Sequence, residues 1–236
     1  LNAANARILN FELSGGVMMK VICLDGSPCE SFDTNRITLG PAQRVDVLIE
    51  DVSQLVELLE VSSSKALNAA IFEPISSKLT SVKNSLSTEP YYSWPDTKNA
   101  KKIDVHMQGG AMGNLSKATF EGEERGLRDL ALKEAKLWAF NGNIGGYGLS
   151  LAEIEIGEVV VIKAWNDTAW PHAMHLHGHH FWVDSSEFGE KKRALLRDTY
   201  LMQPGEKAEL VFIANNPGAW LFHCHMLEHH AAGMGG

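Results

Sequence analysis

Three side chains that commonly bind metal ions stand next to one another near the end of this sequence. In WLFHCH, Cys224 lies between His223 and His225. Neighbouring side chains of an extended strand point to opposite faces, so the thiol would face one way and both imidazoles the other. One strand can therefore contribute ligands to two separate metal centres, one on each side.

The cysteine face has further donors of a kind that suits copper. His229 and Met234 follow Cys224 at two intervals of five residues, which predicts a loop that leaves the strand and wraps around one ion. A second imidazole is expected from His172, because Pro171 bends the chain there and lets the ring face the cysteine. A thiolate, two imidazoles and a weak thioether are the ligands of blue-copper electron-transfer sites.

The two histidines that flank the cysteine need partners that are presented in the same way. The upstream segment PHAMHLHGHHF contains His175 and His177, which an extended chain places on one face. These two residues, together with His223 and His225, predict a second metal centre opposite the cysteine site.

Zinc is the main alternative metal, because it also binds cysteine and histidine. Structural zinc sites close around one ion with four ligands, whereas these segments offer seven or eight candidates, which favours copper. A single histidine is more often a structural polar residue than a ligand. Six histidines at the spacings of these two segments, together with one cysteine and one methionine, are not explained as separate structural polar residues.

Four histidines lie outside the two predicted centres. His179 and His180 are expected to form hydrogen bonds or fill space beside Phe181, and His230 to orient a ligand or pass protons. No role is assigned to His106. Two nearby acids, Asp167 and Glu228, would either guide a cationic donor or, more simply, be solvated surface groups. The choice between these two roles is left open.

The elements that would position these residues are short strands. In QRVDVLIE (43–50), Val45, Val47 and Ile49 occupy every second position, a period of two that is typical of a half-buried strand. EIEIGEVVVIKAWN (153–166) predicts a strand, a turn at Gly157 and a long buried strand, and the segment 204–225 repeats this design. The one helical candidate is GLRDLALKEAKLWAF (126–140). Further strands are predicted at 8–13, 17–24 and 36–39. Short strands with regular turns indicate an all-β fold, an antiparallel sandwich or barrel.

Composition excludes several classes of protein. A hydrophobic share of 44% and a charged share of 21% are ordinary for a globular protein, and the net charge of −8 argues against a nucleic-acid partner. No apolar run is long enough to predict a membrane span. The three cysteines do not indicate a disulfide scaffold. Cys23 and Cys29 flank a turn and would be either a local disulfide or two small buried thiols.

The sequence begins with neither a methionine nor a signal-peptide pattern, as though inside a strand. We therefore expect a piece of a longer protein. Residues 76–100 are polar and contain proline, which predicts a linker between two domains.

These motifs together resemble those of the multicopper oxidases, the family of laccases, ascorbate oxidase and bacterial copper-resistance oxidases. The resemblance is carried by HAMHLHG (172–178), by HCH (223–225) through His229 to Met234, and by LGPAQRVDVLIE, RDTYLMQPGE and NNPGAWLFHCH. It implies cupredoxin-like antiparallel β-sandwich or Greek-key barrel domains. The latter part of a middle domain would span 1–80, a linker 81–100, and a C-terminal domain 101–236.

The resemblance also implies a function and a set of copper ligands. Electrons from a small-molecule or metal-ion donor would enter at a type 1 copper and pass through Cys224, His223 and His225 to a trinuclear cluster that reduces dioxygen to water. The full-length protein would hold up to four copper ions and be periplasmic or secreted. The implied ligands are His172, Cys224, His229 and axial Met234 for type 1, His175 for type 2, and His177, His223 and His225 for the type 3 pair.

Three departures from the family pattern affect these expectations. The family's cluster takes eight histidines, and four come from an N-terminal domain with two more His-x-His motifs that this chain lacks, so the chain alone is expected to show little oxygen-reducing turnover. The usual His-Pro step reads His172-Ala173, with proline displaced to Pro171. The span 113–173 contains no methionine, which weakens a specialised cuprous oxidase role.

Two other functions use similar residues: an electron-transfer or copper-binding module with a type 1 site only, and a copper nitrite reductase. His225 argues against both, because a type 1 site alone has no use for a histidine directly after the cysteine.

The expected axial ligand also bears on the redox potential. An axial methionine in place of an apolar residue predicts a modest type 1 potential.

Overall fold

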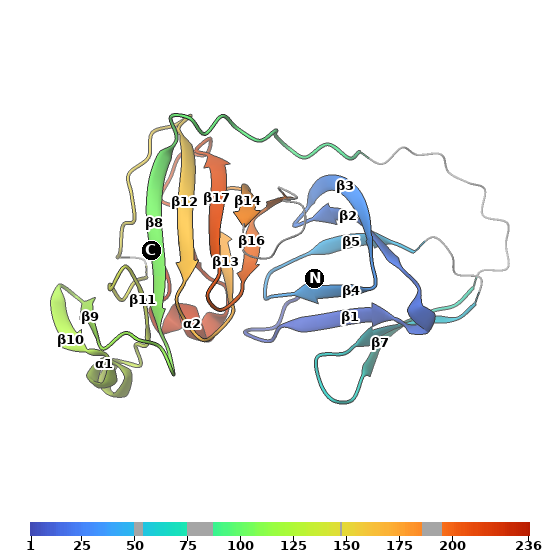
Figure 1. Ribbon diagram of the computed structural model, residues 1–236, viewed down its shortest axis with the longest axis horizontal. Helices are drawn as coiled ribbons and strands as arrows, with labels where there is room; N and C mark the ends of the chain where they lie inside the picture. Colours follow the sequence, from blue (N-terminus) through green and yellow to red (C-terminus); the bar gives the residue numbers. More distant parts are fainter. Residues whose placement is uncertain (50–53, 75–86, 147, 186–194) are drawn as a thin grey trace. The chain divides into compact units, whose positions relative to one another are not determined.

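The computed structural model describes residues 1–49, 54–74, 87–146, 148–185 and 195–236 (Figure 1). The chain divides into two units, Leu1–Tyr92 and Ser93–Gly236. The predicted linker 81–100 includes this boundary, although its residues 81–86 lie outside the described part of the chain. The exact domain limits stay a prediction.

The described part of the first unit is built from short strands. They are β1 (Leu9–Leu13), β2 (Met19–Leu24), β3 (Ser27–Thr34), β4 (Arg36–Leu39), β5 (Val45–Leu48), β6 (Val56–Glu60) and β7 (Leu67–Phe72), with a 3₁₀ turn η1 (Ser14–Gly16) after β1. They pair antiparallel in two sheets of order β4-β1-β6-β7 and β3-β2-β5. The strands predicted in this region are confirmed.

The first unit buries apolar side chains that alternate with polar ones along the strands. The core consists of Leu13, Met19, Ile37, Leu39 and Val56. On β5, half-buried Val45 and Val47 alternate with exposed Asp46 and Leu48, as the period of two predicts.

Cys23 and Cys29, on β2 and β3, are not joined by a disulfide in the structure, which favours the alternative of two separate thiols. Burial, with the nearby Asp46 acting in the same direction, raises the pKa of Cys23 to about 11. This thiol therefore stays protonated at neutral pH.

The second unit contains the predicted metal-binding segments. Its elements are β8 (Lys101–Gly109), β9 (Lys117–Phe120), β10 (Glu123–Gly126), α1 (Leu127–Glu134), β11 (Trp138–Phe140), β12 (Val159–Asn166), β13 (His172–Leu176), β14 (Phe181–Ser185), β15 (Leu195–Arg197), β16 (Thr199–Met202), β17 (Lys207–Ile213), β18 (Phe222–Cys224) and α2 (Leu227–Ala231). No helix in the described residues is both long enough and apolar enough to cross a membrane.

Besides the two-stranded pair of β10 and β9, two sheets organise the described part of this unit. The larger has the order β11-β8-β12-β17-β14-β15, and the smaller has the order β16-β13-β18. Strands β8, β12 and β17 run side by side, with β8 and β12 parallel (Figure 1). The other pairs are antiparallel, and the predicted all-β class is confirmed.

Three local predictions differ from the structure. Residues 153–156 form no strand, although the long buried strand after Gly157 is present as β12. The helix predicted over 126–140 ends at Glu134, because Ala135 takes a left-handed conformation with φ 54°, and β11 follows. The chain after the cysteine is the short helix α2 rather than a loop.

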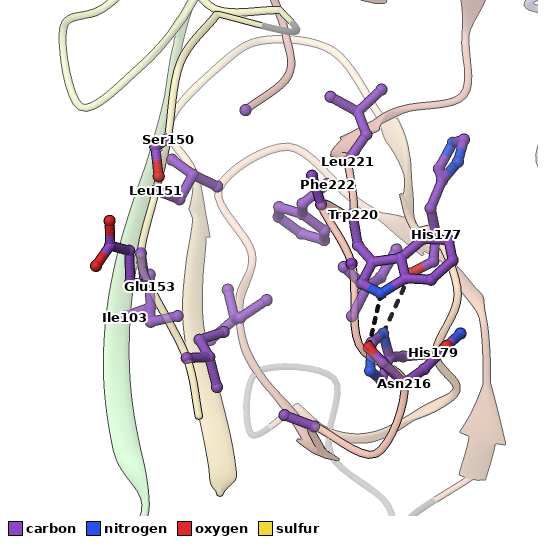
Figure 2. A pocket seen from close by; sticks show the side chains of 18 of the residues that line it. Ile103, Ser150, Leu151, Glu153, His177, His179, Asn216, Trp220, Leu221 and Phe222 are labelled. Atoms are coloured by element: carbon purple, nitrogen blue, oxygen red, sulfur yellow. Dashed lines mark hydrogen bonds between the residues drawn. The ribbon is translucent and has the colours of Figure 1, made fainter. Parts of the chain in front are cut away.

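The turn after β13 is closed by an aromatic side chain. Gly178 has φ +71°, and a Cβ there would lie 2.6 Å from the Trp220 ring, so only glycine fits. The side-chain amide of Asn216 donates to the Gly178 carbonyl at 3.1 Å. The Trp220 indole donates to the Asn216 carbonyl at 2.8 Å (Figure 2).

Candidate metal centre

The register of the smaller sheet decides which side chains meet. Strand β13 pairs with β18 so that Met174 lies opposite Cys224 and His175 lies opposite His223. Side chains of directly opposed residues share a face, so His175 and His223 face one side and Cys224 faces the other. His172, three residues before His175, falls on the cysteine side because three is an odd number of steps along a strand.

On the cysteine side, three potential ligand atoms converge. The sulfur of Cys224 lies 3.6 Å from Nδ1 of His172 and 3.6 Å from Nδ1 of His229. The two Nδ1 atoms are 3.0 Å apart. All three atoms lie within 4.8 Å of one another, close enough to hold one metal ion.

Helix α2 and the turn after it place the remaining residues of this group. The amide of His229 donates to the Met226 carbonyl at 2.9 Å, which starts the helix directly after the strand. The chain then returns, and the amide of Cys224 donates to the carbonyl of Met234 at 3.1 Å. Met234 is fully buried, and its main chain lies beside Cys224. The two five-residue intervals from Cys224 to His229 and on to Met234 therefore correspond to one short helix and a turn that brings the chain back beside Cys224.

Burial keeps this group uncharged. It raises the pKa of the Cys224 thiol to about 12 and lowers the pKa of His172 to about 3. The pKa of His229 is also lowered by burial. A buried neutral thiol, a buried neutral imidazole and a half-buried one, all aimed at one point, fit a soft or borderline cation that displaces the thiol proton. The donor set is consistent with a type 1 copper site.

Trp138 is a residue of this site that the sequence did not reveal. Its ring centroid lies 5.0 Å from that of His172 and 4.6 Å from that of His229, and the residue is only 6% exposed. It covers both imidazoles and excludes water. The aromatic end LWAF of the segment predicted as a helix (126–140) favours a strand, and this could have indicated that Trp138 lies in a strand.

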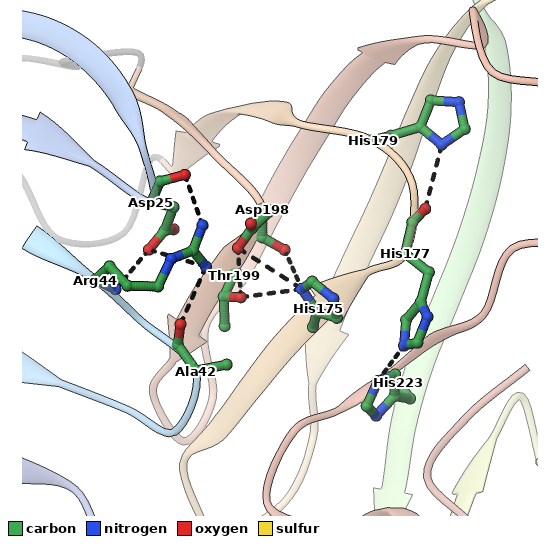
Figure 3. Close-up of polar contacts among 9 residues, drawn as sticks. All are labelled: Asp25, Ala42, Arg44, His175, His177, His179, Asp198, Thr199 and His223. Carbon is green, nitrogen blue, oxygen red and sulfur yellow. Dashed lines mark hydrogen bonds and ion pairs between the residues drawn. The ribbon is translucent and has the colours of Figure 1, made fainter. Parts of the chain in front are cut away.

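On the other side of β18, four imidazoles gather. The ring centroid of His175 lies 5.0 Å from that of His177, 5.7 Å from that of His223 and 5.6 Å from that of His225. Nε2 of His177 and Nε2 of His223 face each other at 3.0 Å (Figure 3). The structure thus brings together all four histidines predicted for the second centre.

Several of these rings are oriented by neighbouring groups. Nδ1 of His175 lies 2.8 Å from the Asp198 carbonyl and 3.0 Å from the Thr199 hydroxyl, which leaves its Nε2 for a metal ion (Figure 3). Nδ1 of His223 lies 2.9 Å from the carbonyl of Cys224. Nδ1 of His225 is buried and has no hydrogen-bond partner among the described residues. Burial lowers the pKa of His175 to about 4 and that of His223 to about 3, so both imidazoles are neutral at neutral pH.

The histidines predicted to lie outside the centres have identifiable surroundings. His179 is buried beside Phe212 and Trp220, at centroid distances of 5.2 and 6.0 Å. The ring of His230 lies 4.6 Å from that of His223, next to a predicted ligand. His106, to which no role was assigned, stacks on Trp165 at 4.2 Å.

The two acids near the cysteine side differ in their surroundings. Oδ2 of Asp167 lies within hydrogen-bonding distance of Nε2 of His106, at 2.9 Å, so Asp167 is not simply a solvated surface group. Glu228 is exposed in the first turn of α2. Neither observation tests whether these acids guide a cationic donor.

A cleft of about 660 Å³ borders the second group of imidazoles (Figure 2). Its walls include His177 and apolar side chains such as Leu151, Trp220 and Phe222. The imidazole group therefore adjoins an open, largely apolar surface of this unit.

Comparisons with known proteins bear on the family of this chain. Two family models, both described as multicopper oxidase, match residues 1–55 and 123–236. The multicopper oxidase MmcO of Mycobacterium tuberculosis is 27% identical over 239 residues, 99% of this chain and 44% of that protein. The multicopper oxidase mco of Staphylococcus haemolyticus is 28% identical over 240 residues, 100% of this chain and 46% of that protein. The chain belongs to the multicopper oxidase family, and it spans about half the length of these curated relatives.

Solved structures show the same fold. The laccase-like multicopper oxidase CueO of Ochrobactrum sp. superposes with a TM-score of 0.76 at 22% identity, covering 100% of this chain and 53% of that one. McoA of Aquifex aeolicus gives a TM-score of 0.69 at 21% identity, with 100% and 53% covered. The predicted cupredoxin-like architecture is confirmed.

Proposed function

We propose that this chain forms the C-terminal part of a multicopper oxidase that couples one-electron oxidation of small-molecule or metal-ion donors to the reduction of dioxygen to water. One observation carries the proposal: β18 presents Cys224 to one group of ligands and His223 to another, on opposite faces. This arrangement suits electron transfer between two adjoining centres better than a single isolated site.

In this proposal His172, Cys224, His229 and Met234 would hold a type 1 copper. His175 would bind a type 2 copper, and His177, His223 and His225 would bind the type 3 pair. Copper at these positions would accept single electrons from the donor and deliver them to dioxygen, whose reduction to water also consumes protons.

The residues of the chain supply position and environment. Cys224 and its two flanking histidines form a short covalent connection between the two faces of the strand. Trp138 excludes water from the cysteine side, which strengthens electrostatic interactions there. The contacts of His175 with Asp198 and Thr199 fix its orientation.

The second group offers four imidazoles, half of the eight that the family resemblance implies. The proposal therefore includes a further polypeptide region that supplies the remaining ligands. A periplasmic or secreted location is also part of the proposal, on the family resemblance alone.

Copper titration of the purified chain tests the proposal. The wild-type chain should develop intense blue absorption, because a buried thiolate with two imidazoles binds the ion. Cys224→Ser should bind copper without the blue colour, and His106→Ala, away from both groups of ligands, should behave as wild type. A colourless copper complex of the wild-type chain would contradict the ligand set.

A further inference from the structure

A chain of buried hydrogen bonds runs from Asn166 to His172. Nε2 of His172, on the edge of the ring away from Cys224, lies 2.8 Å from the hydroxyl of Thr168. That hydroxyl lies 2.7 Å from Oδ1 of Asn166. The exposed fractions are 0% for Asn166, 7% for Thr168 and 0% for His172. Water is therefore largely excluded from all three side chains.

The direction of the hydrogen bonds follows from the Asn166 amide. Its Nδ2 donates to the carbonyls of Trp170 at 2.8 Å and Gln203 at 2.9 Å, so its Oδ1 must face Thr168. The hydroxyl proton of Thr168 can go to Oδ1 of Asn166 or to the Trp170 carbonyl at 3.1 Å. Both groups are acceptors only. In either case Thr168 presents a lone pair to His172.

The lone pair of Thr168 selects one form of the imidazole. A neutral histidine carries its proton on one ring nitrogen and a lone pair on the other. Because Thr168 Oγ1 accepts, the proton belongs on Nε2. The lone pair is then on Nδ1, the atom that lies 3.6 Å from the sulfur of Cys224 and 3.0 Å from Nδ1 of His229.

We propose that Thr168, held by Asn166, is a positioning residue that fixes His172 in the Nε2-protonated tautomer and so prepares Nδ1 to bind the metal ion. The metal-binding consequence rests on the proposed function, whereas the tautomer itself does not. A metal-binding histidine whose other nitrogen is anchored is both oriented and made a stronger ligand.

Nitrogen-15 NMR of the metal-free chain tests the tautomer directly, with the His172 signal assigned by its loss in His172→Gln. We expect the His172 proton on Nε2 in the wild type. In Thr168→Val, which keeps the shape of the side chain but cannot accept, the Nδ1-protonated form should gain population. Thr168→Ser should restore the wild-type signal. A wild-type proton on Nδ1, or an unchanged signal in folded Thr168→Val, would overturn the proposal.

Copper affinity, measured by competition with a chelator, gives the second readout. Thr168→Val should weaken copper binding by about 10- to 100-fold, and Thr168→Ser should stay close to wild type. Equal affinities in all three chains would contradict the positioning role. If the wild-type chain binds no copper, the proposed function fails, while the NMR result still decides the tautomer. If Thr168→Val does not fold, the wild-type and Thr168→Ser spectra still decide it.

Discussion

At the scale of single residues, burial determines the protonation of the cysteine site. The Cys224 thiol, with its pKa raised to about 12, keeps its proton at neutral pH, whereas His172, with its pKa lowered to about 3, is already neutral. Copper binding must therefore displace one proton, and that proton comes from the thiol. The metal stabilises the thiolate that burial alone disfavours.

This protonation state predicts how copper affinity depends on pH. Between about pH 6 and 8 the apparent affinity should rise about tenfold per pH unit, because one thiol proton is released and the neutral imidazoles release none. Titrations at several pH values, in a buffer that does not bind copper, measure the slope. Cys224→Ser should show a nearly flat dependence. A flat dependence in the wild type would mean that the thiolate is already present without metal.

Trp138 gives a residue-scale prediction about stability. Trp138→Ala should lower the free energy of unfolding of the metal-free chain by about 3–5 kcal/mol, because it removes a large buried side chain from the rings of His172 and His229. Trp138→Phe keeps an aromatic ring and should lose less. Urea unfolding measures both. Equal stability of Trp138→Ala and wild type would show that the ring is not part of a packed wall.

At the scale of elements, the turn after α2 returns the chain to β18. Gly233 has φ +113°, and a Cβ there would lie 2.6 Å from the Trp138 carbonyl and 2.7 Å from the Ile144 side chain. The next residue, Met234, accepts the hydrogen bond from the amide of Cys224. This glycine therefore allows a close approach that brings Met234 beside the cysteine.

Gly233→Ala should destabilise the chain and alter the blue absorption of its copper complex. The backbone alone costs about 1–3 kcal/mol, and the close contacts add to this. Gly205→Ala is the matched control, since Gly205 also has positive φ, +80°, but no neighbour within 4 Å of the added carbon. It should lose only the backbone contribution and keep the wild-type spectrum. Identical spectra for the two variants would contradict the importance of this turn.

The sequence predicted the strands in which residues alternate strictly between two faces. It missed a strand that depends on pairing with a segment distant in the sequence. The period of two placed Cys224 and His223 on opposite faces, and the structure has this arrangement. The helix predicted over 126–140 was too long, because the strand at Trp138 depends on pairing with Gly109 of β8. No local pattern encodes that pairing.

In the candidate site, too, the ligands could be predicted from the sequence and the contacts of the residues packed around them could not. Ligand types and spacing in the sequence were sufficient to group His172, Cys224 and His229, which the structure brings together. The segment LWAF could have placed Trp138 in a strand, but the contacts of Trp138 and Thr168 with His172 could not be predicted, because an aromatic or a threonine carries no signal of what it contacts. Their roles depend on three-dimensional packing around His172.

At the scale of the whole molecule, the chain spans about half the length of its curated relatives. If the remaining ligands come from another region, the copper-loaded chain should be blue but consume little oxygen with a phenolic donor, as measured with an oxygen electrode. A heat-inactivated sample and free copper at the same concentration are the controls. Rapid oxygen uptake by the pure chain would show that no further ligands are needed.

The most direct measurement is anomalous diffraction at the copper absorption edge from crystals of the copper-loaded chain. We predict one copper peak among His172, Cys224 and His229, and separate copper density on the opposite face of β18 beside His175, His177, His223 and His225. A single ion bound by Cys224 together with both of its neighbouring histidines would contradict the division of this strand between two centres.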